Sequence, residues 1–157
     1  MWPFRRKPKP TSLFAMSDRD AEREMAPREA VRRTTQPTLD RHFALQEEIQ
    51  AAYRRRDRDP KALAAAIAAC KRQIALAPAT ADAMRTAWRD DKGTPLPLPR
   101  HVGFEQLAIV REREGDLAGA IRLAQEAQRQ GWAGEWERRV SRCEAKLAKR
   151  GTDTKSQ

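Results

Sequence analysis

The amino-acid sequence predicts an all-α protein, and three observations support this fold class. Ala and Leu dominate the apolar residues, and Arg, Glu, Gln and Lys make up most of the polar ones. All of these residues lose little side-chain freedom in a helix. The 157 residues include only seven glycines, and no stretch alternates apolar and polar residues between turn dipeptides as a strand would. We therefore expect about six helices.

Residues 1–37 are predicted to form a disordered, basic tail that prolines interrupt. Each proline lacks an N–H and clashes with the preceding turn of a helix. The low hydrophobicity of the segment also cannot offset the entropy of ordering it. One short helix over residues 17–25, with Ser17 as its N-cap, is compatible with the pattern. The helical domain then spans residues 38–150, and residues 151–157 form a disordered C-terminus. The prolines of the tail are Pro3, Pro8, Pro10, Pro27 and Pro37.

The first long helix is expected to begin near Thr38 or Asp40 and to run to about Arg56. Its apolar residues recur at spacings of three and four, which places them on one helical face. A run of Arg and Asp residues ahead of Pro60 ends the helix at a turn. The residues of the apolar face are Leu39, His42, Leu45, Ile49, Ala52 and Tyr53.

Two further helices are expected before residue 92. The second helix starts at Asp59 and Pro60, because Asp is a good N-cap and Pro suits the first helical position. Pro78 should stop it, and a third, shorter helix covers Ala81 to Asp90. The apolar stripe of the second helix is Leu63, Ile67, Cys70, Ile74 and Ala77, and the third helix presents Ala83, Met84, Ala87 and Trp88.

Residues 92–100 contain three alternating prolines, which favour an extended, polyproline-like connector. We expect Leu96 and Leu98 to pack this connector against the helices that it crosses. A free proline-rich ligand for an SH3-like domain is the alternative interpretation.

The last three helices are clearly delimited by glycines and by one cap. The fourth runs from about Val102 to Glu114 and ends at Gly115, a C-cap residue of the left-handed type. Asp116 caps the fifth, which runs from Leu117 to about Gln130 and ends at Gly131. The sixth runs from about Gly134 to Lys149, and its inner stripe is Trp136, Val140, Cys143 and Leu147.

Within residues 101–134, Phe104, Leu107 and Ala108 precede a turn at Gly115 and Asp116, and Ala120 and Ala127 follow it. This segment resembles a tetratricopeptide repeat, a helical hairpin of 34 residues. Phe104, Leu107 and Ala108 stand where that motif has Trp, Leu and Gly, and Gly115 and Asp116 match its turn. Ala120 and Ala127 match the small residues of its second helix. Small residues at Ala108 and Ala120 would let the two backbones approach closely. The departures from the motif are Arg111, Ala124 and Trp132.

A second, more degenerate unit of this kind can be read over about residues 47–80. Ala66 and Pro78 fit the motif there, whereas Arg54 and Gln73 replace small residues. The resemblance implies stacked antiparallel hairpins, with the sixth helix as the polar C-terminal cap that such arrays need. An ordinary Ala-rich six-helix bundle is the alternative fold.

The positive charge of the chain lies mainly at its two ends. The formal net charge is +10; residues 1–36 and residues 137–157 each contribute +4, and the 100 residues between them only +2. A surface that neutralises many phosphates would need its Lys and Arg on one face of the fold. The distribution favours solubilising charge over nucleic-acid binding.

The resemblance implies a protein-binding module or adaptor that takes a peptide in a groove lined by the first helix of each pair. The partner-binding residues would be Val102, Glu105, Gln106, Ile109, Glu112 and Arg113, with Glu48, Ala51, Ala52 and Arg55 from the degenerate unit. The groove lacks the Lys and Asn arrangement with which family members bind a terminal carboxylate, which disfavours a co-chaperone role.

The N-terminal residues are a second candidate for the functional surface. Trp2 and Phe4 precede Arg5, Arg6 and Lys7, with Lys9 close behind. Aromatic and basic residues together could adsorb weakly to an anionic membrane, at about 1 kcal/mol per basic residue. A peripheral nucleic-acid or anionic-membrane binder that acts through its basic termini is therefore the alternative function; a short docking motif or an inert tail would fit as well.

No group of residues predicts catalysis, a metal or a cofactor. His42 and His101 each stand alone in the sequence, and Cys70 and Cys143 fall on apolar stripes without metal-ligand spacing. Buried thiols of this kind behave as small apolar groups. We expect a non-enzymatic protein. Without a signal-peptide pattern or an apolar run of about 20 residues, a cytoplasmic location is the default expectation.

Overall fold

A computed structural model describes residues 18–153, and in that part of the chain five helices account for most residues. They are α1 (Asp18–Arg54), α2 (Ala62–Ala87), α3 (Val102–Arg113), α4 (Leu117–Gln130) and α5 (Trp136–Asp153). Two very short strands, β1 (Leu98–Arg100) and β2 (Trp132–Ala133), pair in parallel. The all-α class is confirmed. The N-terminal residues Trp2 to Lys7 lie outside the described part.

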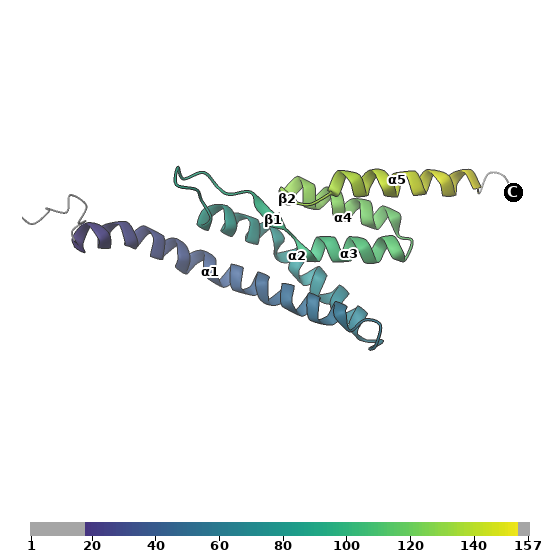
Figure 1. The fold of residues 1–157 in the computed structure, drawn as a ribbon, viewed down its shortest axis with the longest axis horizontal. Helices are drawn as coiled ribbons and strands as arrows, with labels where there is room; N and C mark the ends of the chain where they lie inside the picture. Colours follow the sequence, from purple (N-terminus) through teal and green to yellow (C-terminus); the bar gives the residue numbers. More distant parts are fainter. Residues whose placement is uncertain (1–17, 154–157) are drawn as a thin grey trace, which may run out of the picture.

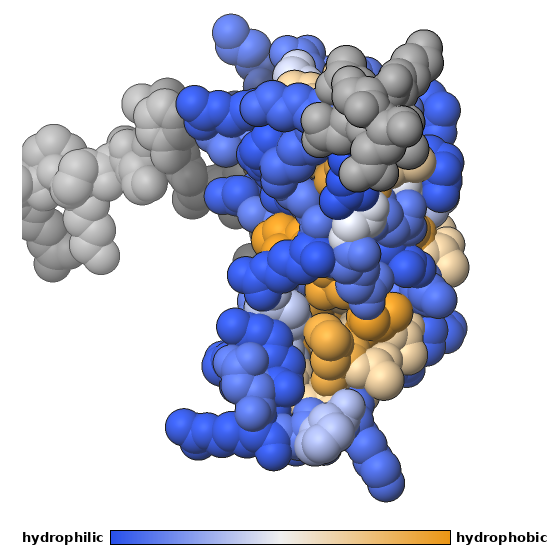
Figure 2. Space-filling view, turned by 90° about the vertical axis from the view of Figure 1, so that its right-hand side faces the viewer, coloured by the Kyte–Doolittle hydropathy of each residue, from blue (hydrophilic) through white to orange (hydrophobic). Residues whose placement is uncertain are grey.

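The helices form a stack in which each packs mainly against its neighbour in the sequence (Figure 1). α1 and α2 make a long hairpin, α3 packs on α2, α4 on α3, and α5 on α4. Seen from the end where α1 turns into α2, the surface is mostly hydrophilic, with hydrophobic side chains exposed near its middle (Figure 2). The core is thus built between successive helices.

α1 is longer than the sequence predicts. It begins at Asp18 instead of near Thr38 and continues through Pro27 and Pro37, so the expected helix boundary is wrong. Each proline costs the helix one backbone hydrogen bond, while the Ala, Arg and Glu residues around them favour helix. In the turn before Pro37, the hydroxyl of Thr35 donates to the carbonyl of Val31 at 2.8 Å. Thr35 and Leu39 are buried, so packing holds this part of α1.

α2 likewise continues through Pro78, so the expected third helix is the second half of α2. This is why the described chain has five helices and not six. Ala77, Thr80, Ala81 and Met84, which flank the proline, are all buried. Burying them against the core outweighs the one hydrogen bond that Pro78 cannot donate. The helix starts at Ala62, two residues later than expected, although Asp59 Oδ1 does accept the N–H of Lys61 at 2.9 Å.

The connector after α2 begins as a closed loop, and its last residues, Leu98–Arg100, are extended as strand β1. The N–H of Leu96 donates to the carbonyl of Trp88 at 2.9 Å, and Gly93 takes the left-handed φ of 79° that the turn requires. Leu98 then pairs with Trp132 in the β1–β2 ladder and is buried, whereas Leu96 is 46% exposed. The expected packing is therefore confirmed for Leu98 and wrong for Leu96.

The last three helices lie where the sequence predicts them. Gly115 and Gly131 have left-handed φ values of 83° and 87°, and Asp116 Oδ1 accepts the N–H of Gly119 at 2.8 Å. α5 begins at Trp136 and extends to Asp153, beyond the expected end at Lys149.

Among the described residues, one helix is long and apolar enough to cross a membrane by length and composition alone. It is α2. In this structure α2 packs against both α1 and α3.

Candidate functional site

α3 presents two opposite faces, because successive residues of a helix are about 100° apart. The residues expected to line the partner groove, from Val102 to Arg113, share one of these faces. Phe104, Leu107 and Arg111 lie on the other. The structure places a cleft on this second face, between α2, α3 and α4.

Two of the predicted groove residues, Glu105 and Glu112, form ion pairs within the chain. Glu112 accepts hydrogen bonds from Arg139 (2.9 Å), Arg142 (2.9 Å) and Lys146 (2.8 Å), all on α5. The hydrogen bond from Arg142, aided by Lys146 and opposed by burial, lowers the pKa of Glu112 to about 2. Glu105 pairs with Arg100 at 2.6 Å.

The other four predicted groove residues on α3 differ in their exposure and in their contacts. Arg113 is exposed and donates to the hydroxyl of Tyr53 at 3.2 Å, whereas Val102 packs against the core cluster that contains Ile49. Gln106 and Ile109 are half-buried, and Gln106 Oε1 is buried without a hydrogen-bond partner. This face thus fastens α1 and α5 to α3 and leaves little free apolar surface.

The degenerate unit contributes little to that face. Glu48 forms an ion pair with Arg72 of α2, and Ala52 is buried. Ala51 and Arg55 are exposed, and Arg55 donates to the carbonyl of Ala51 at 3.4 Å.

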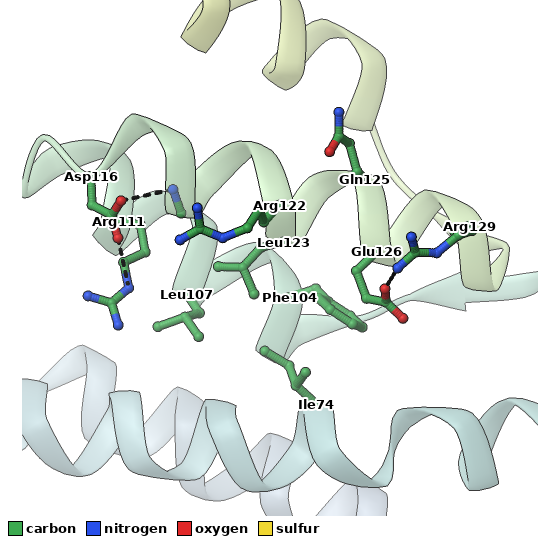
Figure 3. A pocket seen from close by; sticks show the side chains of 11 residues that line it. Ile74, Phe104, Leu107, Arg111, Asp116, Arg122, Leu123, Gln125, Glu126 and Arg129 are labelled. Atoms are coloured by element: carbon green, nitrogen blue, oxygen red, sulfur yellow. Dashed lines mark hydrogen bonds and ion pairs between the residues drawn. The ribbon is translucent and has the colours of Figure 1, made fainter. Parts of the chain in front are cut away.

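The cleft on the other face has a volume of about 530 Å³ and an apolar floor (Figure 3). Ile74 comes from α2, Phe104 and Leu107 from α3, and Leu123 from α4. Phe104 and Leu107 are almost fully buried, at 0% and 4% exposure. Ile74 and Leu123 are half-buried and are the apolar side chains that a ligand would meet first.

Small residues bring α3 and α4 close enough to form this floor. Ala108, Ala120 and Ala124 are each 0% exposed, so no larger side chain separates the two backbones. The sequence predicts this role for Ala108 and Ala120. Gly119 instead makes room for the N-cap of α4, because a Cβ atom there would lie 2.2 Å from a carboxylate oxygen of Asp116.

Charged residues surround the apolar floor. Figure 3 shows Arg111 and Arg122 at one end of the cleft and the ion pair of Arg129 with Glu126 at the other. Arg111 lies 3.3 Å from Glu114 and 3.7 Å from Asp116. Arg122 is exposed and has no ion-pair or hydrogen-bond partner in the part of the chain that the structure describes. Arg122 is therefore the one rim arginine without a neighbouring carboxylate among the described residues.

The structure also brings together two histidines that are far apart in the sequence. The rings of His42 and His101 are 5.2 Å apart, and Trp132 lies against both. His101 Nδ1 accepts the N–H of Phe104 at 3.2 Å and so caps α3, while His101 Nε2 and His42 Nδ1 have no partner. Burial, and then the charge of His42, lowers the pKa of His101 to about 3; burial also lowers the pKa of His42. The two histidines, which are isolated in the sequence, are therefore neighbours in the fold.

Gln73 joins the same buried region to α1 and α3. Its side-chain amide donates to the carbonyl of His42 at 3.1 Å and accepts the N–H of Gly103 at 2.7 Å. A Cβ atom on Gly103 would lie 2.8 Å from Gln73 Oε1. Gln73, read in the sequence only as a departure from the repeat motif, therefore connects three helices.

Within residues 18–153, no group of three or more His, Cys, Asp or Glu side chains is placed to hold a metal ion. Cys70 and Cys143 are both buried and lie in different core clusters. Burial raises the pKa of the Cys70 thiol to about 12, which keeps it in the unreactive thiol form.

Comparison with known proteins adds no relative. No family model matches the chain, and neither the curated proteins nor the solved structures contain a match.

Proposed function

We propose that this chain is a non-enzymatic protein-binding module, or adaptor, that takes a segment of its partner in the cleft between α2, α3 and α4. The observation that supports this most directly is the apolar floor of Ile74, Phe104, Leu107 and Leu123 inside a charged rim. Apolar contacts at the centre and polar groups around them are the usual arrangement of a protein interface.

The arrangement of the helices supports a tetratricopeptide-like module. Each helix packs on the next in sequence, and α3 and α4 form the hairpin whose residues resemble the motif. α5 covers α4 and exposes several Arg and Lys residues, as a capping helix would. In tetratricopeptide arrays the ligand lies in the groove lined by the first helix of each pair. In this chain the apolar surface that is left free lies on the opposite face of α3, which favours that face as the binding site.

The proposal is tested by selecting peptides of 16 residues from a random library on the full chain. The Leu123→Asp variant is the counter-target, because its carboxylate would sit in the apolar floor. We expect peptides that bind the parent chain and lose at least about tenfold in affinity for the variant. Circular dichroism and thermal melting check that the variant folds.

A matched control is Leu147→Asp on α5, where the native side chain is 39% exposed and outside the cleft. We expect this variant to bind the selected peptides like the parent. Peptides whose affinity is the same for the parent and for a folded Leu123→Asp variant would contradict the proposed site.

The second candidate function is peripheral binding to nucleic acid or to an anionic membrane through the basic ends. α5 favours it, because this helix contains six Lys or Arg against three Asp or Glu. Removing residues 1–17 leaves α1 whole and tests whether the N-terminal residues contribute to such binding. The measurement compares the binding of the full and the truncated chain to anionic vesicles and to duplex DNA. Binding that vanishes in the truncated chain and in 500 mM salt would support the N-terminal residues as the binding site. Binding by the full chain that persists in 500 mM salt would contradict an electrostatic site at either end.

A further inference from the structure

We propose that the partner segment bound in this cleft is acidic and amphipathic, with apolar side chains on Ile74 and Leu123 and a carboxylate beside Arg122. This inference rests on the proposed function and names the chemistry of the partner. Three observations support it: the charge of the rim, the size of the cleft, and the charge of the segments that could compete for it.

Two of the three arginines of the rim have carboxylate partners within the chain. Arg129 is compensated by Glu126, and Arg111 lies within 4 Å of Glu114 and Asp116. Arg122 alone among the rim arginines has no such partner in the described chain. A ligand carboxylate at this end would meet the unpaired guanidinium, which can bind both oxygens of a carboxylate.

The size of the cleft sets how the segment binds. A volume of about 530 Å³ has room for a few side chains but not for a whole helix. The partner segment would therefore lie across the opening of the cleft and insert only the apolar side chains of one of its faces. Ile74 and Leu123 line the opening from opposite helices, α2 and α4 (Figure 3), so they would contact the inserted side chains from both sides.

The chain itself offers two competing occupants. Residues 1–17 contain apolar side chains, but also four Lys or Arg and no Asp or Glu, so Arg122 would repel them. Residues 18–30 of a second copy contain five acidic and three basic residues, with Met25 66% exposed. That segment has a net negative charge, which suits Arg122, but Met25 is its only large apolar residue. It could therefore insert only one apolar side chain into the cleft. A separate acidic partner fits better.

The test uses three synthetic 15-residue peptides with leucines at identical positions of one helical face. Their other positions carry Glu, Gln or Lys. Fluorescence anisotropy measures the dissociation constant of each peptide for the full chain in 50 mM and 300 mM salt. We expect the Glu peptide to bind at least about tenfold more tightly than the Lys peptide in low salt, with a smaller difference in high salt.

Arg122→Glu is the decisive variant. We expect it to weaken the Glu peptide about five- to tenfold and to strengthen the Lys peptide. The matched control is Arg138→Glu on α5, which makes the same charge change at a side chain 75% exposed and away from the cleft. This control should leave both dissociation constants within about twofold.

Four results would overturn the inference. Equal binding of the three peptides, or equal effects of Arg122→Glu and Arg138→Glu, would show that this rim does not select acidic partners. Light scattering that shows self-association, abolished by removing residues 1–30, would assign the cleft to a second copy. If library peptides depend on Leu123 but lack acidic residues, the proposed function stands and only this inference fails.

Discussion

The imidazole rings of His42 and His101 lie 5.2 Å apart, centre to centre, and each side chain is at most 1% exposed. One nitrogen of each ring has no hydrogen-bond partner. α1 supplies one histidine, and the residue that precedes α3 supplies the other. This contact therefore joins the first hairpin to the rest of the fold and predicts how the protein responds to acid.

Acid should destabilise the fold through these histidines before it affects the carboxylates. Burial lowers the pKa of both side chains in the folded state, that of His101 to about 3, whereas unfolded histidines titrate near 6.5. Below pH 6.5 the unfolded chain thus binds more protons than the folded chain. The free energy of unfolding should fall by up to about 1.4 kcal/mol per pH unit for each histidine.

Denaturant titrations between pH 7.5 and pH 4.8 measure this slope. The His42→Phe variant keeps an aromatic ring next to Trp132 and removes one titrating group, so its slope should be shallower. An unfolding free energy that stays constant across this range in the parent chain would show that the buried pair does not resist protonation.

The ion pairs of Glu112 should stabilise the packing of α5. Three cations of α5 lie within 3 Å of its carboxylate. The hydrogen bond from Arg142, aided by Lys146, lowers the pKa of Glu112 to about 2. The stability that this group contributes is therefore present above about pH 4.5 and is lost as the pH falls towards 2. Glu112→Gln should lower the unfolding free energy by about 1–2 kcal/mol at pH 7.

Glu135→Gln is the control for this substitution. Glu135 forms an ion pair with Arg138, and both side chains are more than 70% exposed, so its loss should cost less than about 0.5 kcal/mol. Equal melting temperatures for the two variants would refute the role assigned to Glu112.

Gly103→Ala should destabilise the junction between α2 and α3. The new methyl group would lie 2.8 Å from Gln73 Oε1 and 3.1 Å from the carbonyl oxygen of Cys70. The hydrogen bond from Gly103 to Gln73 would have to lengthen. We expect a loss of about 1–2 kcal/mol after subtracting the helix propensity gained by Ala.

Gly151→Ala makes the same substitution in α5 with nothing within 4 Å of the new atom. It should be neutral or stabilising by up to about 1 kcal/mol. Thermal melts of the two variants compare them directly, and a Gly103→Ala variant as stable as the Gly151→Ala variant would contradict the close packing at Gln73.

Pro78→Ala should stabilise the protein, because Pro78 is exposed and lies inside α2. Alanine restores one N–H to the helix, at the cost of a more flexible unfolded chain. The net gain should be about 1–2 kcal/mol in denaturant melts. A loss of stability would instead mean that the proline ends one helix and begins a loop, as the sequence alone suggests.

The parts of the fold that the sequence predicts well are those set by local signals. Gly115, Asp116 and Gly131 fix the ends of α3 and α4 by conformation and capping, and the structure has them there. The effects of Pro37 and Pro78 are predicted wrongly, because a proline's local cost is opposed by burial that only the tertiary structure creates. The Leu98–Trp132 pairing is too short to leave a pattern in the sequence.

The cleft could be predicted only in part. Phe104 and Leu107 belong to the repeat resemblance, and Ile74 belongs to the stripe of the second helix. Leu123 and Arg122 carry no signal of their own, since their role depends on how α2 and α4 flank α3. The same holds for His42 and His101, which lie 59 positions apart in the sequence and touch only in the fold.

The most direct test of the proposed cleft is a methyl NMR spectrum of the full chain, with Ile, Leu and Val labelled, titrated with a selected peptide. The two faces of α3 carry separate reporters. We expect the methyl signals of Ile74, Leu107 and Leu123 to shift on binding, while those of Val102 and Ile109 on the opposite face stay in place. Shifts confined to Val102 and Ile109 would contradict the cleft and would return the site to the face that the sequence resemblance implies.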